Sequence, residues 1–466
     1  MAVGHPLLRQ FRLLKQQEKI VNIQLPWGDD LLDLKVPDSW DLLWPGPVSK
    51  HHHQDTEMDE SLLIEHSLNS PIAMAPLEAM DLKKKKILIV VDDNTRPTPV
   101  HRFFNQILDR LERAGADFDS ITLMSALGIH TAMTQSQMEE KVGKQALAKI
   151  TWKNHDAFDE KAKHSFGTTS RGTPVELNRA IFKADFIISL GLVEPHLWAG
   201  FGGGLKNILP GLASANCIGV HHALISRPPY LVNRVGMAPE DNSFRLDLEE
   251  ACSLINTPIF CVNVCLDRSG AIVAAFSGDA VNVHRKGVEF NIDHSGRFLK
   301  GPVDGIIVNS FPMDFNFKQS MKGVANSLPA LKTGGVVMGF LKAENGLDDI
   351  VLPDRSLPQW LLKQILRLLG PRRTLWFLET VKPGINVEEK FLLYYSMHLI
   401  RQYELLFHVP TLGDHEVKRL AMFKQFHHPQ GVIDRAARMM KTNSRVAVFP
   451  EAGATFPILD QNQQSK

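Results

Sequence analysis

The stretch FIISLGLVEPHLWAGFGGGLKNILPGLASANCIGVHHALI, residues 186–225, indicates the fold class of this chain. Its apolar start, Phe186 to Leu192, predicts a strand buried on both faces, as in a parallel sheet. The polar loop that follows therefore leaves the carboxyl end of a strand, where open α/β sheets bind ligands. That loop and its continuation carry residue types typical of a ligand site, namely His196, the run Gly200-Phe201-Gly202-Gly203-Gly204, Lys206, His221 and His222.

Two interpretations of the glycine run are open. Glycines lack a Cβ, so backbone N–H groups can approach a phosphate closely, and a helix starting near Leu205 would point its positive end at that phosphate. A tight strand-to-helix connection also uses glycine for geometry alone, which is the more common case for a single glycine turn. The combination of imidazoles, an amine and a phosphate-compatible turn in one unit favours a ligand site.

Strand, loop and helix alternate around this stretch. Ile87 to Val91 and Ser120 to Ala126 are predicted strands, and Pro99 to Ala114 and Gln135 to Lys149 are predicted helices. This alternation predicts a mainly parallel sheet with helices on both faces. The loops DDNTRP, GIH and EPH each follow a strand, so we expect them to leave the sheet at one edge.

These loops supply the candidate side chains. Asp93 could accept hydrogen bonds from ribose hydroxyls, and the planar fork of Arg96 could hold a carboxylate or phosphate. A helix cap formed by Asp93 or Thr95 explains much of the same motif without a ligand. His130 alone would more often be structural, but together with His196 from a neighbouring strand end it forms a candidate acid–base pair.

The C-terminal part predicts a second α/β layer, with strands in GIIVNS and GGVVMGFL and a helix in QWLLKQILRLL. We therefore expect two α/β domains with mainly parallel sheets and an active site in the cleft between them. Residues 1–293 would form the cofactor-binding domain and residues 294–466 the domain that closes over the substrate. Residues 291–301 are a predicted hinge, and the tail RVAVFPEAGATFPIL is expected to return toward the N-terminal domain.

The N-terminal part carries weaker signals. Residues 18–45 predict a hairpin that turns at PWGDD. Ser49 to Ser70 is polar and aperiodic and predicts a solvated linker, in which His51 to His53 could bind metal only adventitiously.

Composition excludes several functional classes. The 52 basic and 51 acidic residues give a formal charge of +1, so bulk charge predicts no nucleic-acid partner. The four cysteines lack a CxxC pair and are expected to be buried thiols in a reducing compartment. No apolar run is long enough to span a bilayer and the N-terminus lacks a signal-like apolar region. We therefore expect a cytoplasmic protein without a membrane partner.

Several motifs of this sequence, in their order along the chain, resemble those of the nickel-pincer lactate racemase family. His222 lies sixteen residues past Lys206, as in that family's pattern of a GGxK motif followed by a histidine. The resemblance extends from LPWGD near the N-terminus to the end of the chain and includes the blocks DDNTRPTP (92–99), ALGIHTAMT (126–134), GTPVELNR (172–179), GDAVNVHRKG (278–287) and QSMKG (319–323).

The resemblance implies a nickel-pincer nucleotide, the nickel complex of pyridinium-3,5-bisthiocarboxylic acid mononucleotide. Lys206 would attach it covalently as a thioamide, and His222 would be the nickel ligand, which suits the preference of nickel for imidazole and sulfur. Asp93, Thr95 and Arg96 match family positions that hold the cofactor. Positions that hold the substrate are matched by Arg96, Gln319 and Lys322.

The implied reaction inverts C2 of a small 2-hydroxy acid. One histidine takes the hydroxyl proton while hydride moves from Cα to the pincer carbon, and return of the hydride to the opposite face yields the other enantiomer. His130 and His196 would be the two bases. The resemblance also implies cofactor-maturation enzymes as partners. Leu197, Trp198 and Lys318 differ from the residues usual in the family at these positions, which predicts a changed substrate pocket. Lactate is therefore one candidate substrate among several. The role of Trp360 is left open.

Other classes stay open. A zinc hydrolase could use His130, His196 and His222 with Asp93, although no HExxH pair supports it. A nicotinamide dehydrogenase would need a GxGxxG turn that GFGGGLK does not match cleanly. A non-catalytic nucleotide-binding protein would have less reason to carry both His130 and His196.

Overall fold

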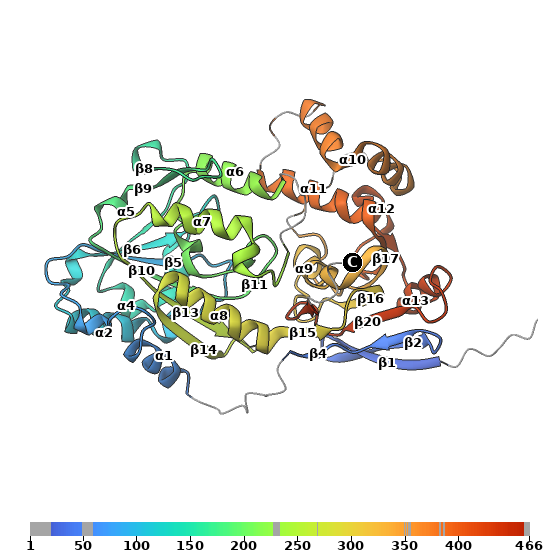
Figure 1. The fold of residues 1–466 in the computed structure, drawn as a ribbon, viewed down its shortest axis with the longest axis horizontal. Helices are drawn as coiled ribbons and strands as arrows, with labels where there is room; N and C mark the ends of the chain where they lie inside the picture. Colours follow the sequence, from blue (N-terminus) through green and yellow to red (C-terminus); the bar gives the residue numbers. More distant parts are fainter. Residues whose placement is uncertain are drawn as a thin grey trace, which may run out of the picture.

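The computed structural model describes residues 20–48, 59–226, 234–267, 269–348, 350, 352, 356–381, 384 and 387–460. Two six-stranded sheets dominate these residues, and helices cover each sheet (Figure 1). The predicted α/β fold class is confirmed. No helix in the described part of the chain is long and apolar enough to cross a membrane.

The first sheet contains the predicted strands of residues 87–192, in the order β14-β13-β10-β5-β6-β7. Only the β13–β14 pair is antiparallel, so the loops after β5, β6 and β10 leave the sheet at the same edge, as predicted. The strand bounds are Ile87–Asp92 (β5), Ile121–Ala126 (β6), Thr151–Asn154 (β7), Phe186–Leu192 (β10), Ile259–Leu266 (β13) and Ile272–Asp279 (β14).

Alternate residues of the central strands pack into two separate hydrophobic cores, one on each face of the sheet. In β5, Ile87, Ile89 and Val91 pack on one face of the sheet, and Leu88 and Val90 pack on the other. This is why the strand is apolar throughout rather than alternating. The first face is covered by α1 (Glu60–Asn69), α2 (Phe104–Arg113) and α3 (Gln135–Val142), and the second by α6 (Ala215–Ala223), α7 (Ser243–Ser253) and α8 (Ala280–Ser295).

The second sheet is parallel throughout, in the order β19-β18-β17-β16-β20-β3. Helix α9, Phe317–Ser327, follows its strand β16 and so begins at the carboxyl edge of this sheet. The remaining elements are β16 (Val303–Asn309), β17 (Leu331–Phe340), β18 (Glu404–His408), β19 (Lys424–Gln425), β20 (Arg445–Phe449), β3 (Asp41–Leu43), α10 (Gln359–Val381), α11 (Val387–Gln402), α12 (Asp414–Leu420) and α13 (Pro429–Ala437).

The predicted N-terminal hairpin is present as β1 (Ile20–Trp27) and β2 (Asp30–Pro37). It does not pack with the first sheet, as an N-terminal domain of residues 1–293 would require. Its apolar face, which includes Ile23 and Leu25, packs against Ile307 and neighbours in the second sheet, and β3 pairs with β20. Residues 20–43 therefore belong structurally to the second sheet, because only there does the hairpin bury its apolar face.

Two predicted irregular segments are regular in the structure. Part of the expected linker forms α1, whose Ile64 and Leu68 are buried against the first sheet, while His51 to His53 lie outside the described residues. The expected hinge at 291–301 contains the end of α8 and strand β15 (Gly296–Leu299).

A small three-stranded sheet joins distant parts of the chain. Strand β15 pairs with β21 (Phe456–Leu459) from the tail and with β4 (Gly46–Pro47) from the N-terminal part. The Phe456 ring of the tail contacts the ring of Phe201 in the glycine run, with 5.6 Å between centroids. The tail thus packs on the loop that carries the candidate site.

Candidate active site

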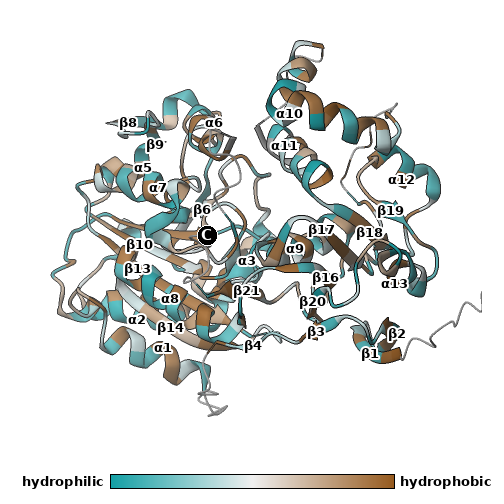
Figure 2. Cartoon of the chain, turned by 45° about the vertical axis from the view of Figure 1, so that its right-hand side comes forward, coloured by the Kyte–Doolittle hydropathy of each residue, from teal (hydrophilic) through white to brown (hydrophobic). Residues whose placement is uncertain are grey.

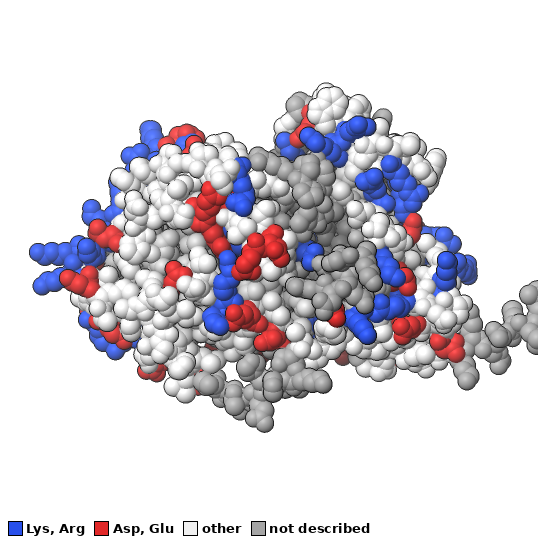
Figure 3. Space-filling view, in the orientation of Figure 1, with Lys and Arg blue, Asp and Glu red and all other residues white. Residues whose placement is uncertain are grey.

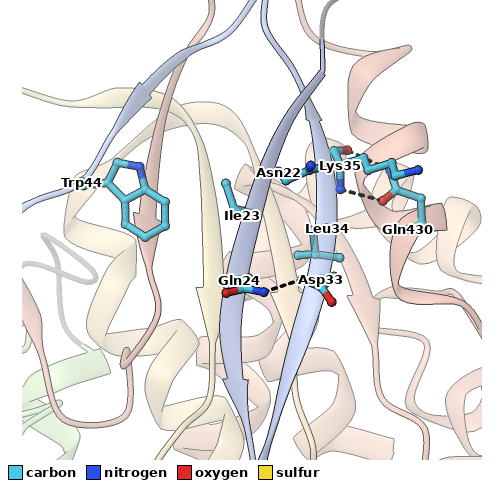
Figure 4. Close-up of a pocket in the computed structure, with 8 residues that line it drawn as sticks. All are labelled: Asn22, Ile23, Gln24, Asp33, Leu34, Lys35, Trp44 and Gln430. Atoms are coloured by element: carbon cyan, nitrogen blue, oxygen red, sulfur yellow. Dashed lines mark hydrogen bonds between the residues drawn. The ribbon is translucent and has the colours of Figure 1, made fainter.

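The candidate site is formed where the loops after β5, β6 and β10 meet. His130 Nδ1, after β6, lies 2.5 Å from Asp93 Oδ2, after β5. Arg96 Nη1, in the same loop as Asp93, lies 3.3 Å from Glu194 Oε1, after β10. Three loops that are distant in sequence are therefore joined by direct polar contacts. A separate hollow of about 810 Å³ beside the β1–β2 hairpin contains none of the candidate residues (Figure 4).

Asp93 orients His130. The Asp93 side chain is buried and also accepts hydrogen bonds from the amide and hydroxyl of Thr95, at 2.9 Å and 2.5 Å. Burial alone would raise the pKa of Asp93, but the hydrogen bonds from His130 and Thr95 lower it below its ordinary value. The carboxylate is therefore ionised, so the network assigns the Nδ1 proton to His130, and in the neutral ring Nε2 carries the free lone pair.

This geometry changes two expectations. The Asp93 oxygens are engaged by His130 and Thr95 rather than standing free for ribose hydroxyls. The Thr95 hydroxyl is likewise directed at Asp93. No helix begins at this loop of the described chain, because the next helical turn, η2 (Val100–Arg102), has Pro99 as its N-cap, so the expected helix cap by Asp93 or Thr95 is wrong and the contact closes a turn instead. Roles for Asp93 and Thr95 in holding a cofactor stay predictions.

A buried lysine holds the loop after β5 in place. Lys141 Nζ, on α3, lies 2.5 Å from Asp92 Oδ1 and donates to the carbonyl oxygens of Asp93 and Arg96 at 3.0 Å and 2.9 Å. The Thr98 hydroxyl donates to the other Asp92 oxygen. Lys141 was not predicted as a site residue, because a lysine in a helical pattern usually points to solvent. It holds the backbone that carries Asp93 and Arg96.

His196 is held in a different way. Its Nδ1 accepts backbone N–H groups of Trp198 and Ala199 at 3.2 Å and 3.3 Å, so its neutral ring carries the proton on Nε2. Burial and then the positive charges of Lys206 and Arg96 lower the pKa of His196 well below its ordinary value. The two candidate bases thus present opposite hydrogen-bonding character: a lone pair on His130 Nε2 and a proton on His196 Nε2.

Lys206 is poised as a nucleophilic amine. Burial, with Arg96 and Arg245 nearby, lowers its pKa well below that of an ordinary lysine, although Glu194 opposes the shift. Its Nζ forms no hydrogen bond or ion pair with any residue that the structure describes. A lysine with a lowered pKa is more often neutral near neutral pH, and a neutral amine is the reactive form.

The glycine run does not form the anion cradle that we considered. No α-helix begins at Leu205, only the single 3₁₀ turn η5, Gly204–Asn207. The amide N–H of Gly202 donates to Glu194 O at 2.6 Å, and that of Gly204 donates to Asn263 Oδ1 at 2.7 Å. These two amides are therefore engaged within the protein, as the geometric interpretation of the run expects.

A fully buried arginine holds the carbonyl side of this run. Arg245 Nη2 donates to Phe201 O at 2.6 Å, and Nη1 donates to Gly203 O at 3.2 Å. Burial lowers the pKa of Arg245 to about 10. No sequence motif marked Arg245, since a single arginine inside an amphipathic helix carries no signal of its partners.

Close packing makes the glycines necessary. A Cβ on Gly203 would lie 2.7 Å from Leu192 O and 2.8 Å from Val193 Cγ2, and its φ of 75° with ψ of −167° is open essentially to glycine alone. We expect Gly203→Ala to lower the free energy of unfolding by about 3 kcal/mol or more.

Gly270 provides the matched control. It also has a positive φ, 80°, but a Cβ there meets nothing within 4 Å. Gly270→Ala should therefore cost only about 1–2 kcal/mol. Denaturant unfolding of both variants measures the difference, and equal losses would show that packing at Gly203 is not the constraint.

His222 is prepared as a ligand by its backbone contact. Its Nδ1 donates to Ile218 O at 2.8 Å, which leaves the Nε2 lone pair free, the arrangement usual for metal-binding histidines. Burial, with the neighbouring His221, lowers the pKa of His222 to about 3, so the imidazole is neutral. Trp198 lies edge-on to His222 at 4.9 Å and to His196 at 6.0 Å, between centroids.

His221 points elsewhere, as expected for neighbours on one helix. Its Nδ1 lies 2.7 Å from Asp247 Oδ2, and both side chains are fully buried. Asp247 also accepts the hydroxyls of Thr169 and Thr173 at 2.7 Å. This buried group ties α6 to α7 behind His222, and it was not predicted.

The second sheet contributes Gln319 and Lys322, which lie three residues apart on α9. Lys322 is exposed, and it lies close enough to the site of the first sheet for its charge to lower the pKa of His196. Partial removal from bulk water lowers the pKa of Lys322 itself, Glu194 raises it and Arg96 lowers it further. Trp360, in contrast, is 68% exposed on α10.

The side chains available to coordinate a metal suit one that already has most of its ligands within a cofactor. Within the described ranges, no group of three or more His, Cys, Asp or Glu side chains is arranged to hold a metal ion. The zinc-hydrolase interpretation of His130, His196, His222 and Asp93 therefore finds no support there. A single imidazole with a free Nε2, in the same charged neighbourhood as the amine of Lys206, suits a metal complex attached to that lysine.

The fold and the site together define a class: a protein of two α/β units in which an unpaired lysine and three histidines gather at the strand ends of the first sheet. Residues 27–230 match the family model of the lactate racemase N-terminal domain. The lactate racemase of Thermoanaerobacterium thermosaccharolyticum is 31% identical over 330 residues, which cover 70% of this chain and 76% of that protein. The chain belongs to the lactate racemase family.

Further comparisons agree with this placement. The lactate racemase of Lactiplantibacillus plantarum is 28% identical over 331 residues, 70% of this chain and 76% of that protein. The solved lactate racemase apoprotein of T. thermosaccharolyticum has the same fold, with a TM-score of 0.77 and 24% identity over 95% of this chain and all of that chain. A protein from Thermotoga maritima gives a TM-score of 0.56 and 19% identity over 82% of this chain and 95% of that chain.

Proposed function

We propose that this chain is a racemase or epimerase that inverts C2 of a small 2-hydroxy acid, lactate being the first candidate, with a nickel-pincer nucleotide attached to Lys206. The observation that supports this most is that Lys206 and Arg96 of the first sheet's loops and Lys322 from the second sheet surround His196 closely enough for the charge of each to lower its pKa. Membership in a family whose named members are lactate racemases supports the reaction type.

Different residues of this chain would hold the nucleotide cofactor and the substrate. Lys206 would carry the nucleotide and His222 would bind its metal through Nε2. Arg96 and Lys322 are cations that face the same space, and they would hold the substrate carboxylate, with Gln319 adjacent on α9. When bound, the pincer nucleotide would supply the acceptor for the substrate's Cα hydrogen.

His130 is the better prepared base. Its Nδ1–H is fixed by Asp93, so Nε2 can accept the proton of the substrate hydroxyl, as in other carboxylate-oriented histidines. His196, neutral with its proton on Nε2, would donate a hydrogen bond to a substrate oxygen. To transfer a proton through Nε2 it must first release its two backbone N–H contacts and bind a proton at Nδ1, so we expect the two directions of inversion to use the histidines unequally.

The first test is the cofactor. The protein should be purified from cells that also produce the pincer-making enzymes, which are its proposed partners, and analysed for nickel content and for the mass of the peptide containing Lys206. We expect nickel together with a lysine-linked, sulfur-containing nucleotide.

A nickel-pincer lactate racemase produced in the same cells is the positive control. If that control is loaded while Lys206 stays unmodified and nickel is absent, the proposal is wrong. If the adduct forms but no 2-hydroxy acid is inverted, the chain is instead a non-catalytic cofactor-binding protein.

A further inference from the structure

Helix α10 carries an exposed face unlike the rest of the molecule. Its backbone is interrupted at Gly370, whose φ of 74° and ψ of 158° are not helical, so residues 359–369 and 371–381 form two arms joined at an elbow. The helix projects from the body beside α11 (Figure 2). Leu366 is buried, and Leu362 and Leu378 pack against the second core, which leaves the opposite face of each arm in solvent.

The exposed face is apolar and aromatic. Six large apolar side chains of α10 are 49% to 82% exposed: Trp360, Leu368, Leu369, Trp376, Phe377 and Val381. In the second arm Arg372 and Trp376, like Arg373 and Phe377, are four residues apart and therefore lie on one side of the helix. Exposed apolar residues that cluster in this way mark an interaction site rather than ordinary surface.

The fully exposed charged residues of α10 are all arginines. Arg367, Arg372 and Arg373 are exposed, and none forms an ion pair with another described residue. None of the exposed positions of α10 holds an aspartate or glutamate, and the one acidic residue of the helix, Glu379, pairs with Lys390 at 2.7 Å. Lysine and arginine side chains are plentiful on this part of the surface (Figure 3).

We propose that the exposed face of α10 binds the surface of an anionic lipid bilayer. A helix with tryptophan, phenylalanine and leucine beside arginines, whose one carboxylate is paired with a lysine, has the chemistry of interfacial helices that lie in the headgroup region. The arginines disfavour a second copy of this face as the partner, since like charges would meet across a two-fold axis. The sequence, without a spanning segment, had predicted no membrane partner. The inference concerns peripheral contact and is independent of the proposed racemase activity.

Vesicle binding by the full chain tests the proposal. Sedimentation with vesicles of phosphatidylcholine and phosphatidylglycerol is compared with pure phosphatidylcholine vesicles, at low salt and at about 0.5 M salt, where charge attraction is screened. We expect binding to the anionic vesicles that weakens with salt. Arg372→Gln with Arg373→Gln should weaken it roughly 10- to 30-fold, and Trp376→Ala with Phe377→Ala by about tenfold or more.

Matched controls come from the first sheet's unit. Phe158 is an exposed aromatic residue, 69% exposed, and Lys83 and Lys85 are exposed lysines, so Phe158→Ala and Lys83→Gln with Lys85→Gln should bind as the wild type does. The substituted α10 residues are exposed, so thermal unfolding should be unchanged. The proposal is overturned if the wild type ignores anionic vesicles, or if the controls lose as much binding. It is also overturned if the wild type self-associates without lipid and the α10 variants are monomeric.

Discussion

Lys206→Arg is expected to abolish both cofactor retention and racemisation. Arginine keeps the positive charge and nearly the length of the side chain, but its delocalised guanidinium does not provide the neutral amine that a thioamide bond requires. Protein from cofactor-producing cells should therefore lack nickel and any added mass at residue 206, and inversion of 2-hydroxy acids should fall to the level of protein without cofactor.

Lys322→Arg is the matched control for this experiment. Lys322 also faces the site, but we assign it to the substrate rather than to the cofactor. This variant should keep nickel and the adduct, and its defect should fall mainly on KM. Loss of the adduct in both variants would mean that the cleft as a whole, and not the amine of Lys206, retains the cofactor.

The charge state of Lys206 gives an independent measurement on protein without cofactor. Because burial and neighbouring cations lower its pKa, the reactive neutral amine should appear at a lower pH than for ordinary lysines, whose reference pKa is 10.5. The rate at which an amine reagent labels Lys206, followed by peptide mass spectrometry across pH, should therefore reach half its maximum at a pH below 10.5, with the peptide of the exposed Lys83 measured in the same samples as a reference for labelling. A half-maximum for Lys206 at or above pH 10.5 would contradict the geometry described for the pocket.

The second large effect is expected at the Asp93–His130 pair. His130→Ala should lower kcat by about 10²–10⁴-fold, the range for removal of a positioned acid–base group. Asp93→Asn keeps the shape but removes the charge that holds the Nδ1 proton of His130, so we expect about a 10²-fold loss or more. Initial rates from each enantiomer of the substrate are the measurement.

The pair is expected to act as a unit. If Asp93 works through His130, the double variant should be hardly slower than His130→Ala alone, because the effects of coupled groups do not add. Nickel content must stay at the wild-type level in Asp93→Asn. If nickel is lost instead, Asp93 serves the cofactor, as the family resemblance implied, rather than the base.

The sequence alone was enough to predict the α/β class, most strands of the first sheet and the edge at which the candidate loops meet. Buried parallel strands such as β10 are apolar throughout, and the polar loops that follow them must leave at their carboxyl ends, so both signals are local. Two further features were predictable because they follow from residue spacing on one helix. Gln319 and Lys322, three residues apart, share one helix face, and the adjacent His221 and His222 point in different directions.

Only the tertiary structure could decide what the candidate residues contact. The glycine run looked suited to a phosphate, yet Glu194, Asn263 and Arg245 engage its backbone, and these partners come from other parts of the chain. From sequence, Asp93 could have faced a ribose or capped a helix, and its contact with His130 became visible only in the structure. The N-terminal hairpin packs on the second sheet because its apolar face is buried against apolar residues there. Periodicity reports how one segment alternates between core and solvent, whereas hydrogen-bond partners, pKa shifts and exposed faces such as that of α10 arise only when distant segments pack together.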